Sequence, residues 1–115
     1  MEYKIDITDG VIVINMKGDL LGTADENDIF ATIQKQIDEG KTLCAAEISQ
    51  INYMNSTGLS VLIRMLTKFR NSGGEMLLVK PSQQAEKLLL ITKLNGIFTT
   101  VASIEAAVNE LKTKL

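Results

Sequence analysis

The chain has 115 residues, of which 45% are hydrophobic, and a formal net charge of −2 at pH 7. That length fits one domain, and the apolar content is enough for a single core. An acidic chain in which no two Lys or Arg residues are adjacent offers no basic surface for a phosphate backbone, so we expect no nucleic acid partner.

Two strands joined by a tight turn are predicted at the start of the chain. Apolar and polar residues alternate over residues 3–8, which is the period of a strand with one face in water. Asp9 and Gly10 predict a hairpin turn. The nearly continuous apolar run over residues 11–16 predicts a more buried strand that ends at residues 17–18.

A helix and a central strand follow. Thr23 and Glu26 have the spacing of a capping box, with Thr23 as the N-cap and Glu26 reaching back to it. Apolar residues then recur at helical spacing until Gly40 ends the helix. Residues 43–48 form a short apolar run typical of a central strand. Cys44 lies within this run, so we expect it in the core and not as a reactive thiol.

The helix predicted after residue 56 has the clearest amphipathic pattern in the chain. Residues 71–74 end it, and residues 76–80 form another strand before Pro81. Its predicted inner face is made of Leu59, Leu62, Ile63, Leu66 and Phe69.

The last third of the chain predicts a helix capped by Ser82, a short strand at residues 98–101, and a helix capped by Ser103. The apolar residues of the first of these helices are Leu88, Leu89 and Ile91. The order of elements predicts an α/β fold, with a mixed four- to five-stranded sheet, an N-terminal antiparallel hairpin and about four helices.

Missing residues and motifs argue against an enzyme. The sequence contains no histidine, which removes the Ser-His and Cys-His nucleophile pairs and the commonest metal ligand. It contains neither a Gly-x-x-x-x-Gly-Lys-[Ser/Thr] loop nor a Gly-x-Gly-x-x-Gly fingerprint. We therefore expect no catalytic residue, no cofactor and no metal.

The most informative segment is the short polar run Asn55, Ser56, Thr57 and Gly58, where an apolar strand passes into the amphipathic helix. The first N–H groups of a helix lack intrahelical partners and carry a partial positive charge, so a phosphate on Ser56 would be well held. The same residue types are ordinary N-caps. Local chemistry alone leaves both interpretations open, with plain capping the simpler one.

The run from Ile48 to Ser60, Ile-Ser-Gln-Ile-Asn-Tyr-Met-Asn-Ser-Thr-Gly-Leu-Ser, resembles the signature of anti-sigma factor antagonists, the bacterial branch of the STAS domain family. In that family the serine of an Asp-Ser-[Ser/Thr]-Gly-Leu-Gly segment begins a helix and is phosphorylated by a partner kinase. Further matches are residues 18–20, 73–75 and 94–98. They follow the family's order over nearly the whole chain, so residues 1–115 are expected to form a single STAS domain with the STAS-like fold.

The resemblance implies an anti-sigma factor antagonist, a binding module without enzyme activity. The unmodified form would sequester an anti-sigma factor serine kinase and so regulate sigma-factor-dependent transcription. Phosphorylation of Ser56 would end this binding, and a serine phosphatase would act on the phosphorylated form. Asn55, Ser56, Thr57 and Gly58 would form the switch loop.

Two positions depart from the family pattern. Asn55 stands where the family has Asp, which keeps the size of the side chain and removes its charge. Residues 21–23, Leu-Gly-Thr, stand where the family often has an acidic residue.

Two other functions are compatible with the sequence. STAS relatives also serve as accessory subunits of lipid-transport ATPases and in stress-signalling assemblies, without a phosphorylation switch. A phosphate- or nucleotide-handling enzyme that uses the helix start at Ser56 is the third hypothesis, which the absent histidine and glycine-rich loop disfavour. With no apolar stretch near the roughly 18 residues of a membrane span and no signal-like N-terminus, we expect a cytoplasmic protein without membrane insertion.

Overall fold

The computed structural model describes residues 1–23 and 26–114, which form five strands and four helices. The strands lie in one sheet in the order β1-β2-β3-β4-β5, antiparallel between β1 and β2 and parallel elsewhere. This confirms the predicted mixed α/β sheet with an N-terminal hairpin. The elements are β1 (Glu2–Thr8), β2 (Val11–Leu20), α1 (Asn27–Asp38), β3 (Leu43–Met54), α2 (Ser56–Asn71), β4 (Glu75–Val79), α3 (Gln83–Ile91), β5 (Thr100–Val101) and α4 (Ile104–Lys112).

The hairpin forms where the sequence predicts it. Asp9 and Gly10 have φ angles of 52° and 82°, and positive φ at both central residues gives a two-residue turn whose twist matches that of the flanking strands. β2 continues past residues 17–18, where the sequence predicted its end, because it pairs with β3 as far as Leu20 and Met54. β3 is likewise longer than the predicted 43–48. This parallel pairing brings the end of β2 beside the start of α2.

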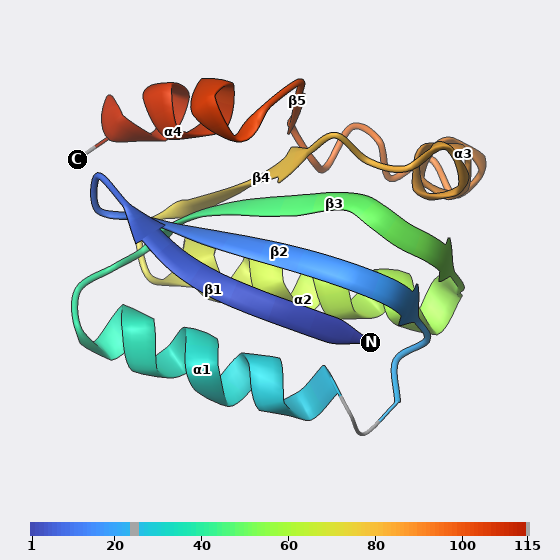
Figure 1. Ribbon diagram of the computed structural model, residues 1–115, viewed down its shortest axis with the longest axis horizontal. Helices are drawn as coiled ribbons and strands as arrows, with labels where there is room; N and C mark the ends of the chain where they lie inside the picture. The colour runs from blue at the N-terminus through green and yellow to red at the C-terminus, as the bar shows by residue number, and fades with distance from the viewer. Residues whose placement is uncertain (24–25, 115) are drawn as a thin grey trace.

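The helices cover the two faces of the sheet unequally. α1 and α2 lie together on one face, and α4 lies on the other (Figure 1). Alternate residues of β2 therefore point into different clusters, with Ile12 and Ile14 toward α1 and α2, and Val11 and Val13 toward α4. Cys44 is fully buried on the α1 and α2 side, which confirms the predicted core position.

α2 is the main helix of the larger cluster. Leu59, Leu62, Leu66 and Phe69 are buried, as its pattern predicted. Ile63 is only partly buried and packs at the edge of the cluster. Val61 and Met65 are buried in addition, because the inner face of α2 touches both the sheet and its flanking helices and is therefore wider than a single stripe.

The α3 prediction is correct for its cap and wrong for part of its apolar face. The Ser82 hydroxyl oxygen accepts a hydrogen bond from the Ala85 N–H at 3.3 Å. Leu89 is buried, whereas Ile91 is 70% exposed. The buried residues of α3, Ala85 and Leu89, are four positions apart and share one face, whereas Ile91 lies two positions after Leu89 and so points to the opposite side of the helix.

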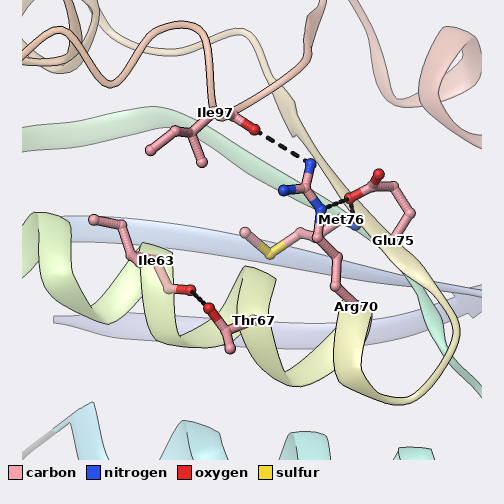
Figure 2. Close-up of polar contacts among 6 residues, drawn as sticks. All are labelled: Ile63, Thr67, Arg70, Glu75, Met76 and Ile97. Carbon is pink, nitrogen blue, oxygen red and sulfur yellow. Dashed lines mark hydrogen bonds and ion pairs between the residues drawn. The ribbon is translucent and has the colours of Figure 1, made fainter.

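The C-terminal end of α2 is fixed by Arg70 (Figure 2). Its guanidinium Nε lies 3.0 Å from a carboxylate oxygen of Glu75 at the start of β4, and another of its nitrogens donates to the Ile97 carbonyl at 3.3 Å. The same Glu75 oxygen accepts from the Met76 N–H at 3.0 Å. These contacts hold α2 against β4 at the end of the helix opposite Ser56.

The start of α1 differs from the predicted capping box. The N-cap is Glu26 and makes no side-chain capping bond. The Glu26 carboxylate instead accepts hydrogen bonds from the Leu21 N–H at 3.1 Å, the Gly22 N–H at 3.3 Å and the Thr23 hydroxyl at 3.0 Å. Residues 24–25 lie outside the described residues. Glu26 therefore reaches back to Thr23 as predicted, but Thr23 is not the N-cap of α1, and the same carboxylate also holds the amides of residues 21 and 22.

Candidate functional site

The candidate site is the turn between β3 and α2. Asn55 has an extended backbone, with φ −101° and ψ −178°, and is the N-cap of α2. Its side-chain oxygen accepts a hydrogen bond from the Gly58 N–H at 2.7 Å, and its backbone carbonyl accepts from the Leu59 N–H at 2.8 Å. The Asn55 side chain therefore satisfies one of the donors that a helix start would otherwise leave unpaired, the Gly58 N–H, while its carbonyl accepts the first regular bond of the helix.

Ser56 is the first residue of α2 and is exposed, as is its neighbour Thr57. Because Asn55 supplies the capping bond, the Ser56 hydroxyl is not needed as a cap. Within the described part of the chain no hydrogen bond is recorded for this hydroxyl, or for the backbone N–H of Ser56 or Thr57. The first turn of α2 contains no acidic residue. An exposed hydroxyl thus stands beside free amide donors in a region of positive helix potential.

Gly58 allows the start of α2 to approach the sheet closely. A Cβ atom at this position would collide with the backbone carbonyl of Leu20, the last residue of β2. Only a residue without a side chain fits at this distance. The glycine of the run Asn55 to Gly58 thus has a packing role, which fixes where the exposed hydroxyls lie relative to the sheet.

The loop after β2 packs against the same helix start. Gly22 has a φ of 75°, and a Cβ built on it would collide with the Thr57 side chain and lie 2.8 Å from the Thr57 carbonyl oxygen. The loop is held in this shape by Glu26, which is only 2% exposed and accepts the three hydrogen bonds described above. A buried carboxylate is stable when its oxygens have several donors. Thr57 therefore packs against Gly22 in a loop whose shape is held by the Glu26 carboxylate.

A third contact comes from α3, far along the sequence. The Gln84 side-chain oxygen accepts from the Met54 N–H at 2.8 Å, and the Gln84 side-chain nitrogen donates to the Met54 carbonyl at 2.9 Å. Met54 immediately precedes Asn55. One side-chain amide thus holds both backbone groups of the residue that leads into the turn.

The structure brings all four sequence-predicted residues, Asn55, Ser56, Thr57 and Gly58, to one short turn. Sequence reasoning missed the two long-range supports of this turn. The only local signal for the Gly22 contact is the glycine itself, which is typical of a tight loop, and nothing in the sequence indicates that Thr57 lies against it. Gln84 had no signal at all, because a glutamine in the first turn of a helix is ordinary.

The only cysteine of the chain does not contribute to the site. Cys44 is fully buried, and burial raises the pKa of its thiol well above the usual range. The thiol therefore stays protonated at physiological pH and is a weak nucleophile.

Within residues 1–23 and 26–114, no helix is both long enough and apolar enough to cross a membrane.

The fold and the site together define a small α/β domain that presents a serine at a helix start. Residues 2–107 match the STAS domain family, and the chain belongs to that family. BtrV of Bordetella bronchiseptica, named as a candidate anti-sigma factor antagonist, is 25% identical over 115 residues, which span 100% of this chain and 98% of that protein.

Solved structures with this fold include two proteins of similar designation. A candidate anti-sigma factor antagonist of Thermotoga maritima superposes with a TM-score of 0.81 and is 22% identical, over 96% of this chain and 94% of that one. The anti-sigma factor antagonist SpoIIAA in its unphosphorylated form gives a TM-score of 0.75 at 20% identity, over 96% and 98% of the two chains. SpoIIAA from Bacillus in its phosphorylated form superposes with a TM-score of 0.73 and is 22% identical, over 95% of this chain and 98% of that one.

Proposed function

We propose that this protein is an anti-sigma factor antagonist whose binding to an anti-sigma factor serine kinase is switched off by phosphorylation of Ser56. Residues 1–115 act as one STAS domain in the cytoplasm, where sigma factors and their regulators meet. A serine phosphatase restores the binding form. The protein carries out no chemistry itself and serves as the substrate of both enzymes.

The observation that carries this proposal is that Asn55, and not Ser56, caps α2. Asn55 makes the capping hydrogen bond to Gly58 at 2.7 Å, and Ser56 is exposed at the first position of α2. Plain capping was the simpler explanation for a hydroxyl at this place, and Asn55 already provides it. A kinase can therefore reach Ser56 without breaking the cap.

The local electrostatics favour a phosphate at this position. A phosphoserine carries about −1.5 to −2 charge at neutral pH and brings three acceptor oxygens. The free N–H groups of the first helical turn and the helix dipole stabilise an anion there. An interface that covers Ser56 in the unmodified form would have to desolvate this charge, so phosphorylation weakens binding while the fold stays intact.

The names of the relatives support the same role. BtrV and the Thermotoga protein are designated candidate anti-sigma factor antagonists, and SpoIIAA is known in a phosphorylated and an unphosphorylated form. The match with BtrV covers 98% of that protein, so it is not limited to a fragment of the relative.

The assignment of Ser56 is tested with three single substitutions of exposed hydroxyls: Ser56→Ala, Thr57→Ala and Ser60→Ala. Each protein is incubated with the cognate anti-sigma factor kinase and ATP, and the phosphate is located by mass spectrometry. We expect one phosphate on Ser56 in the wild type and in the Thr57 and Ser60 variants, and none in Ser56→Ala. Ser60 lies one turn further along α2 and is the matched control.

Phosphate on Thr57 with Ser56 unmodified would overturn the assignment. The absence of phosphate from every protein, with a kinase that modifies a known substrate, would favour the accessory-subunit function over the switch.

A further inference from the structure

β3 extends well beyond β4, the strand that pairs with one of its two sides. The ladder between β3 and β4 runs from Leu43 and Glu75 to Glu47 and Val79. β3 itself continues to Met54. Residues 48–54 of β3 therefore lie past the last pair with β4, and backbone groups on the side of β3 that β4 leaves uncovered need other partners.

The first turn of α3 supplies two of these partners. The Ser82 N–H donates to the Ile48 carbonyl at 3.4 Å, just past the last pair of the ladder. The Gln84 side chain then meets Met54 at the end of the strand, with one bond to its N–H at 2.8 Å and one to its carbonyl at 2.9 Å. Figure 1 shows α3 beside this end of β3. A carboxamide has the donor and acceptor of a peptide group, so Gln84 takes the place of a neighbouring strand.

From this geometry we infer that Gln84 is a positioning residue for Ser56. Its amide fixes Met54, and Met54 and Asn55 together set the direction in which the chain enters α2. Ser56 is then held in the conformation that a partner or kinase recognises, so little ordering is left to occur on binding. The role in phosphorylation rests on the proposed function, whereas the ordering of the turn does not.

The inference is tested with Gln84→Ala, Gln84→Glu and the control Gln83→Ala. Gln83 is the exposed neighbour of Gln84 on α3, so Gln83→Ala changes the same turn of the helix without touching Met54. Alanine is a better helix former than glutamine, so both alanine variants retain α3. Far-ultraviolet circular dichroism and the denaturation midpoint establish that each protein is folded.

The first measurement is amide hydrogen exchange by NMR and needs no kinase. In Gln84→Ala we expect exchange of the Met54 amide proton to rise by at least about tenfold, because its hydrogen-bond acceptor is gone. Gln83→Ala is expected to leave this rate unchanged. Equal Met54 exchange in wild type and Gln84→Ala would overturn the inference, whatever the fate of the proposed function.

Gln84→Glu gives a readout that simple loss of packing would not give. An ionised carboxylate can still accept from the Met54 N–H but cannot donate to the Met54 carbonyl, whereas a protonated carboxyl group can do both. The ionised carboxylate would also face the Met54 carbonyl oxygen without a proton between them. We expect a lower protection factor for the Met54 amide at neutral pH and a return toward the wild-type factor at acidic pH, where the carboxyl group is protonated. A Met54 protection factor that is the same at neutral and acidic pH would contradict the two-bond contact between Gln84 and Met54.

The second measurement is the steady-state kinetics of Ser56 phosphorylation. A less ordered turn lowers the fraction of molecules ready to bind, so Gln84→Ala should raise KM severalfold and leave kcat close to that of the wild type. Increased Met54 exchange with an unchanged KM would refute the positioning role. A wild-type protein that is not phosphorylated at Ser56 would refute the proposed function instead, and the exchange experiment would still decide whether Gln84 orders the turn.

Discussion

Asn55 caps α2 with its side-chain oxygen, at the position where the family pattern has Asp. The capping bond to Gly58 uses only the side-chain oxygen, which Asn and Asp share. We therefore expect Asn55→Asp to change the rate of Ser56 phosphorylation by no more than a few-fold, the size of an exposed charge interaction of about 0.2–1 kcal/mol. Kinase assays on both proteins measure this.

Removal of the cap has a different effect. Asn55→Ala deletes the acceptor for the Gly58 N–H and should lower the free energy of unfolding by about 0.5–2 kcal/mol. Urea denaturation provides the value. A rate increase far above tenfold in Asn55→Asp, with no loss of stability in Asn55→Ala, would show that the kinase recognises charge at this position and that the cap is unimportant.

Gly58 is the residue at which a single methyl group should cause most damage. Gly58→Ala places a Cβ against the Leu20 carbonyl, and a backbone atom cannot move aside cheaply. We expect a loss of about 3 kcal/mol, the upper end of overpacking costs. The matched control is Gly96→Ala, because a Cβ at Gly96 meets nothing within 4 Å. That substitution should change the free energy of unfolding by no more than about 1 kcal/mol. Similar denaturation midpoints for the two variants would contradict the close contact between α2 and β2.

At the scale of elements, α2 is held by its buried face far more than by its terminal ion pair. Leu62 is fully buried, and Leu62→Ala should cost about 2–5 kcal/mol. The Arg70 side chain is 45% exposed in its pair with Glu75, so Arg70→Ala should cost no more than about 1 kcal/mol. Chemical denaturation of both variants measures the two losses in the free energy of unfolding. An unchanged midpoint for Leu62→Ala would show that this helix does not pack on the sheet as described.

The elements that were predicted correctly are those specified by neighbouring residues. The hairpin at Asp9, the apolar face of α2 and the caps at Ser82 and Ser103 each depend on residues within a few positions of one another. The full length of β3 was not predicted, because it depends on pairing with β2. The capping box at Thr23 was wrong in its cap although it is local, because α1 begins after Glu26, whose carboxylate accepts from the Leu21 and Gly22 amides as well as from the Thr23 hydroxyl.

In the candidate site, too, the local features were predicted and the long-range contacts were not. The run Asn55 to Gly58 was found from its residue types and spacing, and its resemblance to a family motif indicated which hydroxyl to examine. Which residue caps the helix is decided by the backbone of Asn55, which local sequence leaves ambiguous between Asn, Ser and Thr. Gln84 is 30 residues from Met54 in sequence, so only the folded chain shows their contact.

At the scale of the whole molecule, the turn that presents Ser56 is held from three sides. The turn that presents Ser56 is braced by β2 through Gly58, by the loop before α1 through Gly22, and by α3 through Gln84. A phosphate added to an exposed hydroxyl on such a turn changes the charge of the surface and leaves the packing beneath it unaltered. In the function proposed above, phosphorylation therefore acts at the interface and not on the fold.

The most direct test is calorimetric titration of the anti-sigma factor with the unphosphorylated protein, the protein phosphorylated on Ser56, and Ser56→Asp. We expect the phosphorylated form to bind at least about 25-fold more weakly, since an uncompensated charge at an interface costs about 2–5 kcal/mol. Ser56→Asp should weaken binding less, because it carries less charge than a phosphoserine. The far-ultraviolet circular dichroism of all three should be the same. Equal affinities for the first two forms, or a spectrum that changes on phosphorylation, would contradict a switch that acts through surface charge.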